Sequence, residues 1–163
     1  MFIFITAFFI SWISVDFIGY WLHRWSHIES SPLYKRHMTH HIKNYPARNF
    51  ISKNYRSSGS DSLAVWFAPF LVIYCSFFFI ILPDSLALMI SLGAIPPAFL
   101  STAIHDLTHL KGSFIWRHKK LEHLAVGHYA HHRNMRKNFG ITSFFWDRIF
   151  KTYWKSLKLP SSL

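Results

Sequence analysis

Three long apolar segments limit the folds that are open to this 163-residue chain. They cover residues 1–22, 63–82 and 86–104, and Asp16 is the single charged residue inside them. About 20 residues of helix, rising 1.5 Å each, cross the roughly 30 Å hydrocarbon layer of a bilayer. We therefore expect an all-α integral membrane protein with about three transmembrane helices, and one domain over residues 1–163.

Two of these segments need separate interpretation. Residues 1–22 lack the basic start and the small-residue cleavage site of a secretory signal, so we interpret them as a retained helix. Pro96 and Pro97 lie inside the third segment. Proline removes a backbone donor and crowds the preceding turn, so the pair predicts a kink or a break in that helix.

Basic residues indicate how the segments are oriented. The chain is 51% hydrophobic yet carries a formal net charge of +11. Seven of the 18 Lys and Arg residues lie between residues 23 and 62, and the other eleven follow residue 104. The connection 83–85 has none. By the positive-inside rule both basic regions face the cytoplasm, and the second and third segments form a tight hairpin.

This topology predicts a multi-pass protein, in the inner membrane of a bacterium or the endoplasmic reticulum of a eukaryote. A basic chain can also bind nucleic acid. The apolar runs are too long for a small nucleic-acid module, and no motif of that kind is present, so we expect no nucleic-acid partner.

The histidines are concentrated on the side assigned to the cytoplasm. Five of the twelve lie in residues 23–41 and seven in residues 105–132, with none in residues 42–104. Ten of them form two pairs and two triplets with spacings of three and four residues, which place imidazoles on one face of a helix. The groups are His23 and His27; His37, His40 and His41; His105 and His109; His128, His131 and His132.

Ten aligned imidazoles are more than one metal ion needs, and they suit two ions held side by side. Imidazole binds zinc, copper, iron and nickel alike. Structural zinc takes four ligands, and a haem takes one or two axial histidines. The lone Cys75 excludes thiolate ligation. We therefore expect a cytoplasmic helical cap with a histidine-rich di-metal site, and non-haem iron beside an apolar cavity fits it best.

Three further residues are candidates at this site. His123 lies five residues before His128 and is either a ligand or a hydrogen-bond partner. Asp16, two helical turns before His23, and Asp106, beside His105, are expected to hydrogen-bond ligand imidazoles. A capping or packing role is the alternative for Asp16. His118, in a basic run, is expected to be solvated or to touch headgroups.

The segments HRWSH, HMTHH, HDLTH and HYAHH resemble the histidine boxes of the fatty acid hydroxylase/sterol desaturase superfamily of membrane di-iron enzymes. The stretches DFIGYWLHRWSH (16–27) and NFGITSFFWDRIFKTYW (138–154) are similar to its other motifs. The chain departs from the pattern at Ser113, where some members have histidine, and at Lys151, where glycine is frequent. We interpret Lys151 as a surface change. The HD that opens the third box resembles the carotenoid ring hydroxylases.

The resemblance implies two iron ions, with O2 as co-substrate and no catalytic residues apart from the ligands. It implies hydroxylation or desaturation of a lipid of the sterol, fatty acyl, sphingolipid or carotenoid type. The sequence has no dinucleotide fingerprint, so the electrons would come from a separate ferredoxin or b-type cytochrome with its reductase. The ligands implied are His23, His27, His37, His40, His41, His105, His109, His128, His131 and His132.

The alternative is a non-catalytic metal- or haem-binding membrane protein, such as an electron carrier or a transporter. A transporter is expected to carry ionisable groups along its spans, and residues 63–82 and 86–104 have none.

Overall fold

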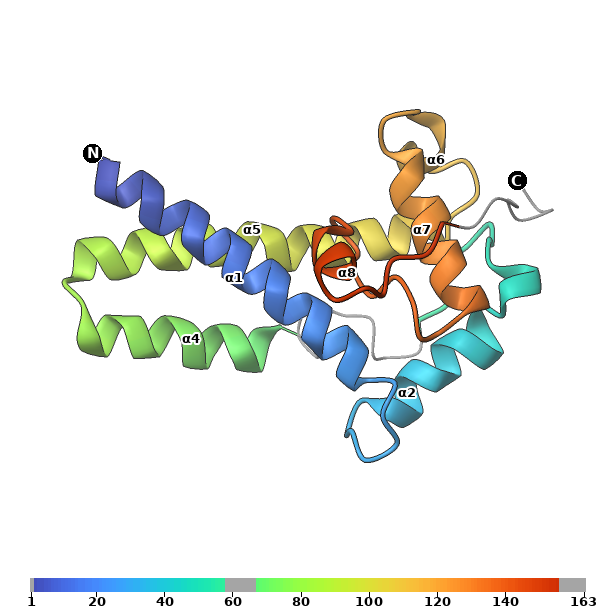
Figure 1. Ribbon diagram of the computed structural model, residues 1–163, viewed down its shortest axis with the longest axis horizontal. Coiled ribbons are helices and arrows are strands. Elements are labelled where there is room, and N and C mark those ends of the chain that lie inside the picture. The colour runs from blue at the N-terminus through green and yellow to red at the C-terminus, as the bar shows by residue number, and fades with distance from the viewer. Residues whose placement is uncertain (1, 58–66, 156–163) are drawn as a thin grey trace.

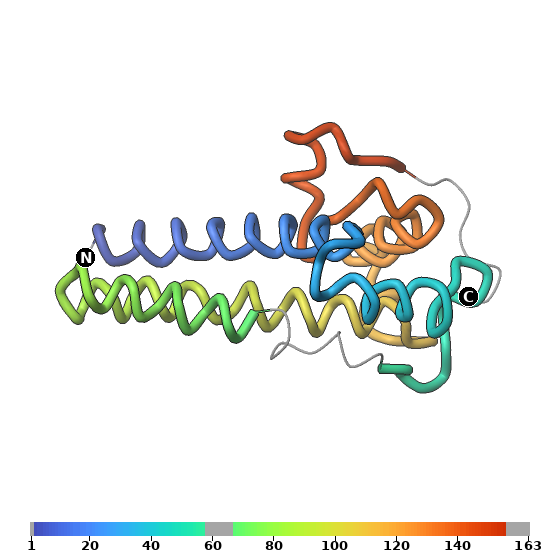
Figure 2. The backbone as a smooth tube through the Cα atoms, turned by 90° about the horizontal axis from the view of Figure 1, so that it is seen from below, coloured from blue at the N-terminus to red at the C-terminus, as the bar shows by residue number. Residues whose placement is uncertain are grey.

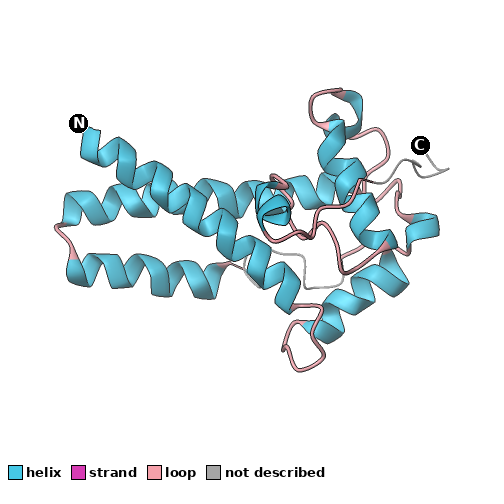
Figure 3. Cartoon of the chain, in the orientation of Figure 1, coloured by secondary structure: helices cyan, strands magenta, loops and turns pink. Residues whose placement is uncertain are grey.

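The computed structural model describes residues 2–57 and 67–155, and this part of the chain consists of helices joined by loops (Figure 3). A lone parallel bridge joins Ser52 and Leu110. The elements are α1 (Phe2–Trp25), α2 (Tyr34–Thr39), the π-helix η1 (His40–Asn44), the 3-10 helix η2 (Ala47–Asn49), α4 (Ala68–Ile81), α5 (Asp84–Thr108), α6 (Phe114–Arg117), α7 (Glu122–Arg133) and α8 (Phe145–Ile149).

The long helices α1, α4 and α5 lie side by side and form the extended part of the molecule (Figures 1 and 2). The start of α1 and the turn between α4 and α5 lie at the same end of the molecule (Figures 1 and 2). The helices α2, α6, α7 and α8 gather around the opposite end, where α1 and α5 finish (Figure 1). The turn after Ile81 is two residues long, so the tight hairpin expected from the sequence is confirmed.

Small residues let α1 and α5 approach closely. A Cβ added at Gly93 would come 2.9 Å from the Cα of Phe8, so only glycine fits where these helices cross. The hydroxyl of Ser11 donates to the carbonyl of Ile90 at 2.6 Å. Ala94 and Ala98 pack with Val15 and Phe67 in one buried cluster. These contacts fix the position of α1 relative to α5.

The outer faces of these helices remain apolar and exposed. Only 11% of the most apolar 18 residues of α1 are buried, and 33% of those of α5. The core helix of a soluble protein would be mostly buried, whereas lipid-facing helices present such surfaces. Both are 25-residue candidate spans, over Phe2–Ser26 and Asp84–Thr108. They match the expected segments 1–22 and 86–104, with each helix longer at the histidine end.

The segment expected at 63–82 is represented by α4, which is apolar but 14 residues long. Residues 63–66 of that expectation lie outside the described residues. At 1.5 Å per residue, the 14 residues of α4 reach about 21 Å, less than the hydrocarbon layer of a bilayer.

The break expected at Pro96 and Pro97 does not occur, because α5 continues through both prolines to Thr108. Adjacent prolines disturb the same helical turn, so the lost hydrogen bonds are confined to one place. Pro97 is buried on the same side as Gly93 and Ala94, where α5 packs on α1. Packing therefore holds the helix together where the isolated segment would be weak.

Candidate metal centre

Ten histidines from four parts of the chain converge where α1 and α5 end. Nine of them form two groups in which the potential ligand nitrogens lie within 4.8 Å of one another. We call them the five-histidine group and the four-histidine group. The five-histidine group is His23, His27, His37, His41 and His131. The four-histidine group is His40, His105, His109 and His128.

Four nitrogens of the five-histidine group form a closed ring. The Nε2–Nε2 distances are 2.9 Å from His27 to His37 and 3.0 Å from His37 to His41. They are 3.2 Å from His41 to His131 and 3.1 Å from His131 back to His27. Nitrogens bound at right angles to one ion at about 2.1 Å lie about 3.0 Å apart, against about 3.4 Å at tetrahedral angles. The ring fits a five- or six-coordinate ion better than a tetrahedral one.

The four-histidine group lies directly beside the first. The Nε2 atoms of His109 and His128 are 3.1 Å apart, and the rings of His40 and His105 are 4.7 Å apart between centroids. His40 stacks on His37 of the other group at 5.9 Å. The two groups are therefore adjacent, as two ions side by side require.

His132 belongs to neither set of mutually close nitrogens but lies between them. Its ring is 4.0 Å from that of His41 and 4.9 Å from that of His109. Its Nε2 is buried and has no hydrogen-bond partner among the described residues. Leaving a buried polar atom unsatisfied costs about 1–3 kcal/mol, so this nitrogen is suited to receive a ligand.

Backbone carbonyls orient four of the imidazoles. A carbonyl can only accept, so each of these imidazoles carries its proton on Nδ1 and presents the Nε2 lone pair to the centre. Several lone pairs facing one another repel unless a cation lies between them, which supports metal binding. The pairs are His23 to Phe139 (2.6 Å), His109 to Phe50 (3.0 Å), His131 to Lys137 (2.6 Å) and His132 to Tyr45 (2.7 Å).

Burial keeps the imidazoles outside the spans neutral. Desolvation lowers the pKa of His27 to about 4. Desolvation, and then repulsion by neighbouring imidazoles, lowers the pKa well below its usual value in His37, His40, His41, His128, His131 and His132. Neutral imidazole is the form that binds metals. The groups are thus ready to bind an ion at neutral pH.

Each triplet is divided between the two groups, contrary to the expectation that its members point one way. His37 and His41 lie in the five-histidine group and His40 in the four-histidine group. In the second triplet, His131 lies in the five-histidine group and His128 in the four-histidine group. Successive residues of an α-helix differ by about 100° in direction, so His40 and His41 face different ways, and residues three apart, such as His128 and His131, still differ by about 60°. Each pair, in contrast, stays within one group.

The other sequence candidates have different positions. His123 is exposed on α7, away from both groups, and His118 is exposed and lies against Phe114. The carboxylate of Asp106 accepts a hydrogen bond from Nδ1 of His105 at 3.1 Å, the contact that was expected of it.

Asp16 does not contact an imidazole, contrary to expectation. Its carboxylate accepts hydrogen bonds from the hydroxyls of Thr142 and Ser143 instead. The carbonyl of Phe139 occupies the position beside His23 that Asp16 was expected to fill. Backbone atoms carry no signal in a sequence, so the orienting carbonyls could not be found from it.

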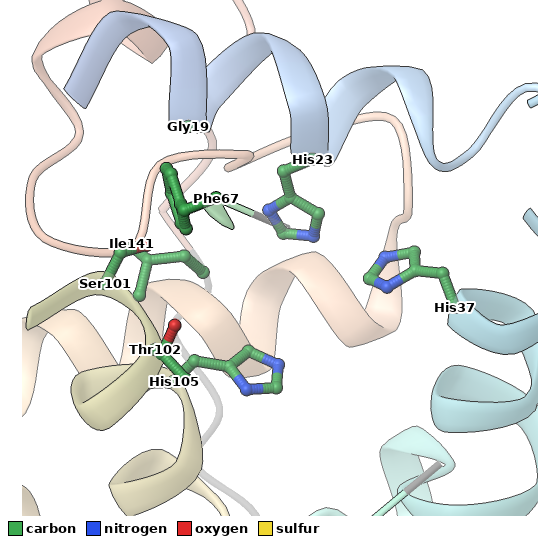
Figure 4. Close-up of a pocket in the computed structure, with 8 residues that line it drawn as sticks. All are labelled: Gly19, His23, His37, Phe67, Ser101, Thr102, His105 and Ile141. Carbon is green, nitrogen blue, oxygen red and sulfur yellow. The ribbon is translucent and has the colours of Figure 1, made fainter. Parts of the chain in front are cut away.

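A small cavity of about 40 Å³ opens between the histidines and the helices (Figure 4). His23, His37 and His105 point into it, and the side chains of Phe67 and Ile141 line its other side. Its lining thus includes members of both histidine groups together with Gly19 of α1 and Ser101 and Thr102 of α5.

Apolar helices that end in two adjacent clusters of buried histidines define a helical membrane protein with a candidate metal centre. The chain belongs to the fatty acid hydroxylase family, whose sequence profile matches residues 8–152. The resemblance stated from the sequence is thereby confirmed, and membership implies a hydroxylase-type oxidoreductase. No curated protein and no solved structure matched the chain.

Proposed function

We propose that the protein is a membrane-bound di-iron oxidoreductase that uses O2 and external electrons to hydroxylate or desaturate a lipid. The observation that carries this proposal is the pair of adjacent histidine groups, buried and neutral, that open into an apolar cavity. Family membership supports the reaction class. The closed ring, with neighbouring Nε2 atoms 2.9–3.2 Å apart, favours a five- or six-coordinate ion, such as iron, over tetrahedral zinc.

The five-histidine group would hold one ion and the four-histidine group, with Nε2 of His132 as a further donor, the other. Such a pair of ions supplies reductive activation of dioxygen and removal of hydrogen from an unactivated C–H bond. The protein itself orients the imidazoles through backbone carbonyls and keeps water away. Phe67 and Ile141 give a hydrocarbon chain an apolar surface beside His23.

We further propose a multi-pass topology with the histidine end on the cytoplasmic side. The lipid would reach the cavity from the bilayer along α1 and α5. A separate ferredoxin or b-type cytochrome would supply electrons. Acidic donors fit the basic residues near the end of α7, which include the exposed Arg133 and Arg136.

Metal analysis of the purified protein tests the site. We expect about two irons per chain, and loss of iron in His40→Ala and in His131→Ala, each of which removes a central donor from one group. His123→Ala is the matched control, because this exposed histidine lies on the same helix as His131. Full metal content in both site variants would refute the assignment.

Lipid analysis of cells with and without the gene tests the reaction. We expect a lipid product that has gained one oxygen or lost two hydrogens, and its disappearance in the His131→Ala strain. A protein that binds two irons but leaves the lipids unchanged would contradict the enzymatic proposal. A strong Soret absorption would indicate a haem carrier instead.

A further inference from the structure

One short backbone segment holds two ligand candidates from different helices. Nδ1 of His23, on α1, donates to the carbonyl of Phe139 at 2.6 Å. Nδ1 of His131, on α7, donates to the carbonyl of Lys137 at 2.6 Å. Both histidines belong to the five-histidine group. The direction of their Nε2 atoms therefore depends on how firmly residues 137–140 are held.

A buried carboxylate holds this segment from behind. Asp147 of α8 is fully buried. Its Oδ1 accepts the N–H of Phe139 at 2.8 Å and its Oδ2 accepts the N–H of Gly140 at 2.7 Å. A Cβ at Gly140 would lie 2.9 Å from Oδ2, so glycine permits this approach. A buried carboxylate loses much hydration, which these charge-assisted hydrogen bonds offset.

The carboxylate and the imidazole of His23 share one peptide group. The N–H of Gly140 and the carbonyl of Phe139 are the two ends of a single planar peptide unit. Asp147 binds one end of this unit and His23 binds the other. A hydrogen bond from the N–H to an anion polarises the peptide and strengthens its carbonyl as an acceptor. The negative charge of Asp147 thus acts on the imidazole of His23 through the polarised peptide, although the two side chains do not touch.

A second connection runs from the same carboxylate to α1. The hydroxyl of Thr152 donates to Oδ1 of Asp147 at 2.7 Å. The same hydroxyl lies 3.1 Å from the phenol oxygen of Tyr20, which is three residues before His23. Asp147 is therefore tied to His23 through the peptide and to the helix that bears it.

We propose that Asp147 is a positioning residue for the five-histidine group, acting on His23 through the Phe139–Gly140 peptide. The inference rests on the proposed metal centre. It assigns the carboxylate a role toward one of the two groups, because the peptide that Asp147 binds through the N–H of Gly140 presents its carbonyl to His23 of the five-histidine group. His109 of that group is oriented by Phe50 instead.

Titration of the metal-free protein with Co2+, followed by its visible absorption, tests this role. Wild type is expected to bind two ions, and His41→Ala and His109→Ala identify which signal belongs to which group. In Asp147→Asn an NH2 faces one of the two backbone N–H groups, so a hydrogen bond is replaced by repulsion. We expect about 10–100-fold weaker Co2+ binding at the five-histidine group and unchanged binding at the other.

The control is Asp16→Asn. This residue is also a carboxylate bonded to the C-terminal loop, but through Thr142 and Ser143 rather than the 137–140 backbone. General loosening of the loop would weaken Co2+ binding in both variants, whereas the proposed role weakens it in Asp147→Asn alone.

Equal weakening at both groups, or no weakening at all, would overturn the inference. If Asp147→Asn does not fold, Thr152→Val is tested instead. It removes one of the hydrogen bonds to Oδ1 of Asp147 and keeps the carboxylate. Weaker Co2+ binding at the five-histidine group alone is again the expected result. A wild type that binds no Co2+ would refute the metal centre itself, which distinguishes the two failures.

Discussion

Asn138 and Lys151 share an uncommon backbone conformation and give a paired prediction. Their φ angles are 54° and 57°, in the left-handed region that favours glycine. The two side chains differ in what they contact. That of Lys151 is exposed, whereas Asn138 is buried. Replacement by glycine should therefore change the free energy of unfolding in opposite directions at the two positions.

At Lys151 the substitution relieves strain. A residue with a Cβ is destabilised by about 1–2 kcal/mol in the left-handed region, and glycine is free of this penalty. Glycine also makes the unfolded chain more flexible, which offsets about 0.5–1 kcal/mol of that gain. Lys151→Gly should thus raise the free energy of unfolding by about 0.5–1 kcal/mol. Lys151 is exposed, in agreement with its interpretation as a surface change, and its left-handed backbone is a conformation that glycine adopts readily.

At Asn138 the same substitution removes contacts. Its Nδ2 donates to the carbonyls of Gly127 at 3.1 Å and Trp154 at 2.7 Å. Its Oδ1 accepts the N–H of Trp154 at 2.7 Å. At about 1 kcal/mol for each hydrogen bond, and with asparagine already tolerant of this conformation, Asn138→Gly should lower the free energy of unfolding by about 2–3 kcal/mol.

Equilibrium unfolding in detergent micelles, followed by tryptophan fluorescence, measures both effects. Lys151→Ala is the control, since it removes the lysine side chain and keeps the Cβ, and it should leave stability nearly unchanged. Shifts of the same sign in both glycine variants, or a loss of stability in Lys151→Gly, would refute the reasoning.

Three further predictions concern the histidine end. Burial lowers the pKa of His27 to about 4 from an ordinary 6.5, so between these pH values the unfolded chain binds a proton that the metal-free folded protein does not. The free energy of unfolding of the metal-free protein should be full above pH 6.5 and fall by about 3 kcal/mol or more towards pH 4. Denaturant titrations at several pH values would measure this fall, and a flat profile would contradict it. For protein loaded with metal, chelation should lower the melting temperature by several degrees and re-addition should restore it; an unchanged melting temperature would contradict metal binding by the folded state. Gly127→Ala places a methyl on the buried ring of Phe144, and calorimetry should record a loss of about 1–3 kcal/mol, against no loss in the exposed Lys120→Ala.

The sequence predicted the parts of this molecule that depend on short-range pattern. Apolar length predicted α1 and α5, and the four-residue spacing of His23 and His27 placed both in one group. The division of the triplets was not predictable in this way, because His40 and His41 each satisfy a spacing rule and packing chooses between them. The role of residues 137–140 also required the fold, since it is exerted by the backbone carbonyls of Lys137 and Phe139.

The five-histidine group spans most of the chain, which affects its formation during synthesis. His27 and His131 touch across 104 residues of sequence. At about 5–20 residues per second, a ribosome needs several seconds to pass from one to the other. During that interval α1 is already made, while the partner imidazole and the segment that orients His23 do not yet exist. The nascent chain therefore has no complete five-histidine group, and the group cannot form until residues 131–139 have been synthesised.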